Sequence, residues 1–60
     1  MTAKQVIKLL EQNGWILHST EGSHRRYKHE NNPIKVTVPY HKGDIKPKTL
    51  HAILKQAGLK

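Results

Sequence analysis

The sequence contains no cysteine, and one tryptophan and two tyrosines are its only aromatic side chains besides histidine. No disulfide can therefore compensate for the small size of a 60-residue chain, which buries only roughly 60% of the surface that it exposes when unfolded. Its stability must come from a small apolar core, or partly from a partner that binds the folded state. The lack of cysteine also fits a reducing, intracellular setting.

Long apolar runs are also missing. No stretch approaches the roughly 20 apolar residues that span a membrane as a helix. The first residues, Met1 to Lys8, are interrupted by polar side chains every few positions and lack the apolar segment of a signal peptide. We therefore expect a single domain over residues 1–60, soluble and cytoplasmic, with no membrane partner.

Acidic residues are scarce, because only four Asp and Glu face eleven Lys and Arg, which gives a formal net charge of +7. A charge of this size predicts a polyanionic partner, with nucleic acid first and an acidic protein or an anionic membrane as alternatives. The few carboxylates argue against a magnesium site. The spacing of His18, His24 and His29 does not match a zinc site. We expect no metal and no cofactor.

The first helix is expected from Thr2 to Asn13. Thr2 and Gln5 form a capping-box pattern, and the apolar residues that follow recur at helical spacing. Gly14 suits the left-handed position that ends a helix. Trp15 is then expected to fold back onto the helix as part of the core.

A second helix is expected near the end of the chain. Pro47 suits its first turn. Its apolar face is predicted to consist of Leu50, Ile53, Leu54 and Ala57. Gly58 is expected to end it in the same way as Gly14 ends the first helix, with Leu59 folding back.

Three short strands are expected between the helices, over Trp15–Thr20, from His24 to Lys28 or His29, and over Ile34–Pro39. Turn-forming residues separate them at Glu21–Ser23 and at Glu30–Pro33. The chain then has the order α-β-β-β-α, an α+β fold with a three-stranded antiparallel meander and both helices on its one apolar face.

Alternation along the strands divides the sheet into two faces. The side chains expected to face the helices are Tyr27, Ile34, Val36 and Val38. Those expected on the open face are His24, Arg26, Lys28, Lys35 and Thr37. The first strand stays ambiguous, because Trp15 and Leu17 compete with Ile16 for the core side.

Two groups of basic residues are candidates for phosphate contact. The first, on the second and third strands, comprises Arg25, Arg26, Lys28 and Lys35. The second, before or within the start of the last helix, comprises Lys42, Lys46 and Lys48. Cations are unfavourable at a helix N-terminus unless an anion joins them there. The alternatives are a solvated strand face for the first group and local compensation by Asp44 for the second.

His24 follows the Gly22-Ser23 turn and is flanked by these cations. Cleaving RNA without a metal needs a base for the 2′-hydroxyl proton, an acid for the leaving 5′-oxygen and cations around the phosphate. Histidine suits either proton-transfer role. By composition alone, however, each of the five histidines is equally an ordinary surface residue.

The order of motifs resembles the HicA family of bacterial toxins, also described as YcfA-like mRNA interferases. The first half of the resemblance comprises Val6–Leu10, Asn13–Trp15, Gly22–His24, Tyr27 and His29. The second half comprises Val36–Pro39, His41, Ile45, Thr49–Leu50, Ile53–Leu54 and Ala57–Leu59. Lys48 departs from the family pattern, in which glycine often stands at this position. This difference bears on the start of the second helix.

The resemblance implies a double-stranded-RNA-binding-like fold and a toxin that cleaves mRNA without a metal, with His24 as its essential residue and Gly22 and Ser23 as the supporting turn. It also implies a HicB-type antitoxin that inhibits by direct binding. It does not identify the acid–base partner of His24, for which the candidates are Ser23, Tyr27, Lys28 and His29. A non-catalytic RNA-binding module of the same fold is the alternative.

Overall fold

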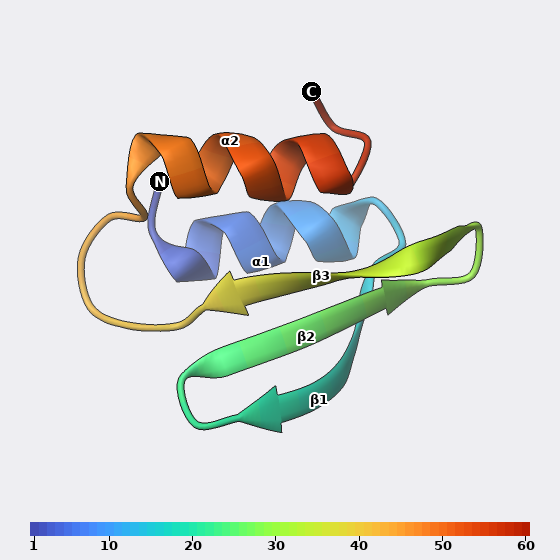
Figure 1. Cartoon of the computed structure of the whole chain (residues 1–60), viewed down its shortest axis with the longest axis horizontal. Helices are drawn as coiled ribbons and strands as arrows, with labels where there is room; N and C mark the ends of the chain where they lie inside the picture. The colour runs from blue at the N-terminus through green and yellow to red at the C-terminus, as the bar shows by residue number, and fades with distance from the viewer.

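The computed structural model describes all residues, 1–60, and has the predicted order of one helix, three strands and one helix (Figure 1). The elements are α1 (Ala3–Gln12), β1 (Ile16–Glu21), β2 (His24–His29), β3 (Asn32–Pro39) and α2 (Pro47–Gln56). The strands form one antiparallel sheet in the order β1-β2-β3. The predicted α+β fold with the α-β-β-β-α order is therefore confirmed.

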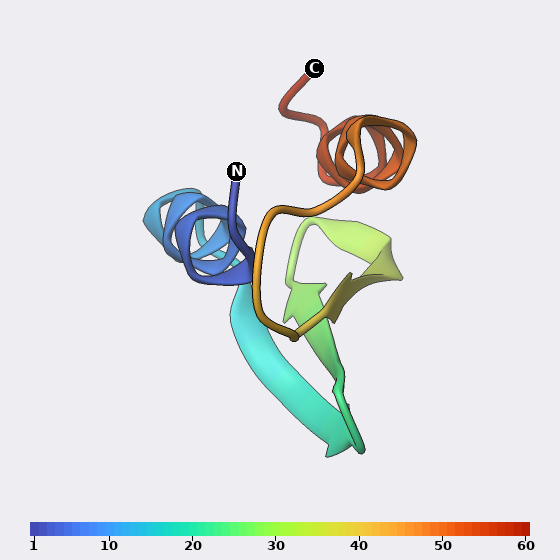
Figure 2. The same ribbon diagram turned by 90° about the vertical axis from the view of Figure 1, so that its left-hand side faces the viewer.

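Both helices lie on the same side of the sheet and pack against β3 (Figures 1 and 2). The β1–β2 hairpin extends beyond the area that the helices cover, as Figure 2 shows from the end of the molecule. The opposite face of the sheet carries no helix, so side chains there meet solvent. Neither helix is long and apolar enough to cross a membrane.

The ends of both helices follow the predicted capping patterns. At the start of α1, the Gln5 N–H donates to Thr2 Oγ1 at 3.3 Å, and the Thr2 N–H donates to Gln5 Oε1 at 2.9 Å. At its end Gly14 has a φ of 90°, and the Trp15 N–H donates to the Leu10 carbonyl at 3.0 Å. The corresponding bond after α2 joins Leu59 to Leu54 at 2.8 Å. These are the bonds of the Schellman motif, so each helix ends at the glycine that adopts a positive φ.

The start of α2 is held by the start of the chain. Pro47 occupies the first turn, and Lys46 precedes it without a capping side-chain bond. Ile45 is buried, and its N–H donates to the Met1 carbonyl at 2.8 Å. Thr2 pairs with Asp44 in an isolated antiparallel bridge. The loop before α2 is therefore fixed against the beginning of α1.

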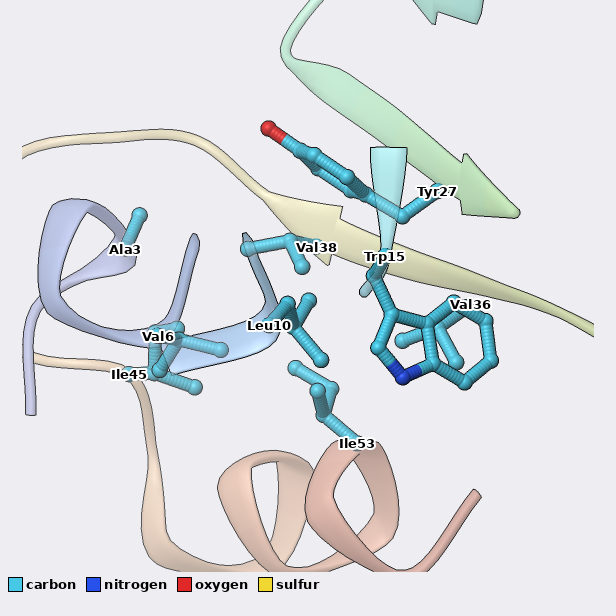
Figure 3. Close-up of a cluster of buried hydrophobic side chains, with 9 residues drawn as sticks. All are labelled: Ala3, Val6, Leu10, Trp15, Tyr27, Val36, Val38, Ile45 and Ile53. Carbon is cyan, nitrogen blue, oxygen red and sulfur yellow. The ribbon is translucent and has the colours of Figure 1, made fainter. Parts of the chain in front are cut away.

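Nine buried residues form the core, which lies between the helices and β2 and β3 (Figure 3). They are Ala3, Val6, Leu10, Trp15, Tyr27, Val36, Val38, Ile45 and Ile53. Trp15 is 2% exposed, which confirms its predicted place in the core. No residue of β1 belongs to the core, because the helices do not extend over this strand.

The prediction that Ile34 faces the helices is wrong. Ile34 is 58% exposed instead of facing the core. Between the pairs Tyr27–Val36 and His29–Asn32, β3 contains two more residues than β2. These extra residues interrupt the alternation of side chains between the two faces of the sheet, so Ile34 does not follow Val36 into the core. Pro33 lies in this irregular part and has no N–H to donate to a ladder.

The first strand is interrupted by a bulge at His18, between the pairs Leu17–Tyr27 and Ser19–Arg26. Leu17 therefore shares a face with Tyr27, and Ile16 points to the opposite face. Both remain about half exposed, at 50% and 57%, because no helix covers this part of the sheet.

The ring of His29 joins two turns that are distant in sequence. Its Nδ1 accepts a hydrogen bond from the Asn31 N–H at 3.0 Å, which leaves Nε2 to donate to the Asn13 carbonyl at 3.0 Å. The ring also lies against Trp15, with 5.2 Å between ring centroids. His29 thus connects the end of α1 to the β2–β3 turn.

Substitution of Gly14 should reveal how much stability this junction contributes. Gly14→Ala places a Cβ 2.8 Å from His29 Nε2 at a φ of 90°, whereas Gly58→Ala has a φ of 73° but no atom within 4 Å of the added Cβ. The left-handed conformation costs roughly 1–2 kcal/mol in both variants. We expect Gly14→Ala to lose at least about 1 kcal/mol more, from the clash with the ring. Urea unfolding measures both; equal losses would contradict the role of His29.

The phenol of Tyr27 should make the fold sensitive to alkali. Burial raises its pKa above the ordinary value of 10.0, and the nearby Glu11 carboxylate adds to this while Arg25 acts against it. Because the folded state favours the neutral phenol, this stabilisation is present below pH 10 and is lost as pH rises above it. Unfolding followed from pH 8 to 11 should show a shallower loss of stability for Tyr27→Phe than for the wild type. An equal loss in the two proteins would contradict this role of the phenol.

Candidate functional site

The β1–β2 hairpin closes through the two residues Gly22 and Ser23. Gly22 has a φ of 57° and Ser23 does not have a positive φ, which fits a type II′ turn with glycine in its first central position. A two-residue turn places the residues on either side of it directly opposite each other, and Glu21 indeed pairs with His24. The predicted turn is confirmed, and it fixes where β2 begins.

His24 is exposed at the first position of β2 and has a strand neighbour on both sides. Glu21 lies opposite it on β1, and Pro39 lies opposite it on β3. The Tyr40 N–H donates to the Ser23 carbonyl at 2.6 Å, which ties the turn to the end of β3. The main chain of three strands therefore holds His24 while its ring stays open to solvent.

The face that carries His24 is the one away from the helices. Tyr27 is buried under the helices, so alternation directs His24, Arg26 and Lys28 to the opposite side. All three side chains are exposed. The predicted grouping of these residues on the open face is therefore confirmed.

Glu21 adds an acidic group to this face. Its Oε1 lies 3.4 Å from Arg26 Nη1, and the two side chains are 64% and 47% exposed. A pair this exposed contributes little to stability, typically below about 1 kcal/mol. Its position beside His24 is more informative, because an anionic ligand there would compete with Glu21 for Arg26.

Arg25, by contrast, does not share this face. Arg25 faces the helix side, where its guanidinium carbon lies 3.8 Å from the centre of the Tyr40 ring. This cation–π contact ties Arg25 to the segment after β3. Lys28 pairs with Ile16 of β1, and Lys35 is exposed in the irregular part of β3.

The residues of the second basic group lie in two different places. Lys46 and Lys48 are exposed at the start of α2, where no acidic residue occupies the first turn. Lys42 instead lines a hollow that it shares with Lys4 at the start of α1 and with His41. Asp44, considered above as local compensation, has a carboxylate oxygen 4.0 Å from the N-terminal ammonium group.

The four candidates for the acid–base partner of His24 now differ in their availability. The Tyr27 side chain is in the core, and both ring nitrogens of His29 have main-chain partners. Ser23 and Lys28 are exposed, and Lys28 shares the face of His24. Lys28 and Ser23 are therefore the two candidates that a substrate can reach. Nowhere do three His, Cys, Asp or Glu side chains lie close enough together to hold a metal ion.

Sequence reasoning did not identify Lys4 or Tyr40 as parts of this region, and it placed Glu21 only in the turn and His41 only in the family resemblance. The two-residue turn did contain the signal for Glu21, because such a turn places its flanking residues in register. No sequence signal brings Lys4 next to Lys42. That proximity depends on the pairing of the first residues with the loop before α2.

Comparison with known proteins adds one finding. The family model described as "HicA toxin of bacterial toxin-antitoxin" matches residues 3–59, which is nearly the whole chain. No curated protein matches the sequence.

The carboxylate of Glu21 should weaken the attraction of a polyanion to the open face. We expect Glu21→Gln to elute from a heparin column at higher salt than the wild type, because Arg26 is released from its ion pair. Glu30→Gln is the matched control, since it makes the same change in net charge in the exposed β2–β3 turn. Equal shifts for the two variants would mean that only net charge matters and that the Glu21–Arg26 pair has no local effect.

Proposed function

The chain belongs to the HicA toxin family of bacterial toxin–antitoxin systems, and from this premise we propose that it is a metal-independent endoribonuclease that cleaves mRNA. Residues 1–60 would act as one domain, in the cytoplasm, with no cofactor. His24 would transfer protons during cleavage, and a HicB-type antitoxin would inhibit the toxin by binding to it directly.

The observation that carries this proposal is the placement of His24. Its ring is exposed on a basic sheet face, while its main chain is held by β1, β3 and the Gly22-Ser23 turn. A group that transfers protons must be open to the substrate and yet fixed in position. His24 meets both requirements without a metal.

The reaction that fits these residues is an intramolecular transesterification at phosphorus. His24 takes the proton of the 2′-hydroxyl, the 2′-oxygen attacks the adjacent phosphorus, and the bond from phosphorus to the 5′-oxygen breaks. The leaving 5′-oxygen receives a proton from Lys28, from Ser23 or from protonated His24 itself. The products are a 2′,3′-cyclic phosphate and a 5′-hydroxyl, and Arg26 stabilises the charge that develops on the phosphate.

Binding of the RNA is assigned to the basic residues on two sides of His24. On the open face these are Arg26, Lys28 and Lys35. Beyond β3 they are Lys42, Lys46 and Lys48. Such contacts give affinity that depends on salt and not on sequence. Arg25, which is partly exposed and lies against the Tyr40 ring, is assigned to the same contacts.

Inhibition by an antitoxin follows from the same charge. A net charge of +7 attracts an acidic protein surface and speeds its association. A partner that covers the open face would block His24 and supply carboxylates to Arg26 in place of Glu21. It would also stabilise a domain whose core has only nine buried residues.

A non-catalytic RNA-binding module remains the second candidate, and the exposed lysines at the start of α2 favour it. Double-stranded-RNA-binding domains grip phosphates by shape across about 16 bp. Incubation with mRNA in the presence of a chelator separates the two functions, because a binding module shifts the RNA and leaves it intact.

Replacement of His24 tests the proposal directly. His24→Ala should lower the rate of RNA cleavage about 10²–10⁴-fold, the usual contribution of general acid–base catalysis. Its fold and RNA affinity should be retained, because the side chain is exposed. His51→Ala, which removes an exposed histidine from α2, is the control and should cleave at the wild-type rate. Wild-type cleavage by His24→Ala in chelator would refute the mechanism.

A further inference from the structure

We propose that the hollow between the start of α1 and the segment Tyr40–Gly43 is a phosphate-binding subsite for the RNA strand beyond the bond that is cut at His24. This inference rests on the proposed function and extends it to residues outside the sheet face. It assigns a role in RNA binding to Lys4 and His41, and it gives Lys42 a defined place.

The hollow is open and has a volume of about 450 Å³. Lys4 forms part of its wall from α1, and Tyr40, His41 and Lys42 form the opposite side. No acidic side chain lines it. Two lysines and a histidine around a space of this size match the charge of a phosphodiester and leave it accessible to a continuous strand.

The other surface hollows of the molecule do not share this chemistry. One along α1 contains a single lysine, Lys8, and its other side chains are uncharged. Another, near Lys28, also includes Glu30, and the hollow around Trp15 and Asn32 contains neither lysine nor arginine. Only the hollow beside Tyr40 combines two lysines with the absence of an acid.

The hollow is connected to the site of His24 by the main chain. Pro39 lies opposite His24, and the next residue, Tyr40, is already part of the wall. The Tyr40 N–H donates to the Ser23 carbonyl at 2.6 Å, and the Arg25 guanidinium lies on the Tyr40 ring. An RNA strand with one phosphate at His24 therefore reaches the hollow by passing around the end of β3.

The other wall is also fixed before any ligand binds. The Thr2–Gln5 capping box orders the first turn of α1, which carries Lys4. The Thr2–Asp44 bridge holds this turn against the loop after His41 and Lys42. Binding therefore requires ordering of only the lysine side chains, and not of the backbone.

Lysine is a flexible point charge and not a planar fork like arginine. The subsite should therefore bind any phosphodiester and contribute affinity without sequence preference. Each neutralised phosphate adds about 0.7 to the slope of log K against log salt for a single strand.

The test uses His24→Ala protein, so that bound RNA stays intact. One variant adds Lys4→Gln and Lys42→Gln to this protein. The control variant instead adds Lys8→Gln and Lys55→Gln, which remove the same charge at exposed positions outside the hollow. The first pair should weaken binding to single-stranded RNA several-fold and reduce the salt slope by about 0.7 to 1. The control pair should leave the slope unchanged, and circular dichroism checks that both pairs are folded.

RNA length distinguishes a subsite from general attraction. Oligonucleotides too short to extend past His24 should bind the Lys4/Lys42 variant and its parent equally, whereas longer ones should not. Equal effects of the two lysine pairs, or equal losses at every RNA length, would overturn the inference.

Cleavage by the wild-type protein is measured separately and tests only the proposed function. If the wild type cleaves RNA while the two lysine pairs give equal salt slopes, the subsite is refuted and the ribonuclease stands. If the wild type binds RNA without cutting it while the slopes differ, the subsite stands and the ribonuclease is refuted.

Discussion

The hydrogen bond between the His29 ring and the Asn13 carbonyl fixes, beside the core, two turns that are distant in sequence. It joins the end of α1 to the β2–β3 turn, next to Trp15 and directly against Gly14. A chain without disulfides and with nine buried residues has few other ways to fix a helix over a sheet. This junction fixes the end of α1, whereas the Thr2–Asp44 bridge fixes its start and with it the place of Lys4.

The two histidines of β2 consequently have opposite roles. His29 uses both ring nitrogens within the fold, whereas His24 has a fixed main chain and a free ring. The same strand therefore carries one histidine that stabilises the structure and one that we assign to chemistry. Their difference comes from position, because the strand ends at a packed junction on one side and at an open hairpin on the other.

The features that could be predicted from the sequence are those set by neighbouring residues. Both helix ends follow from Gly14 and Gly58, and the place of His24 follows from Gly22 and from alternation along a regular strand. Alternation failed at Ile34, because a bulge depends on how two strands fit together and not on either strand alone. The hollow at Lys4 could not be predicted, since it depends on a contact between segments some forty residues apart in the chain, Thr2 and Asp44.

The place of His24 is set by backbone bonds, and the side chains around it on the open face do not take part in them. Arg26, Lys28 and Lys35 can therefore be exchanged by mutation without displacing the histidine. In evolutionary terms, the scaffold separates the position of the histidine that we assign to chemistry from the surface that we assign to ligand binding. Related chains can thus diverge in the ligands they recognise, and in the inhibitors they escape, while the geometry at His24 stays the same.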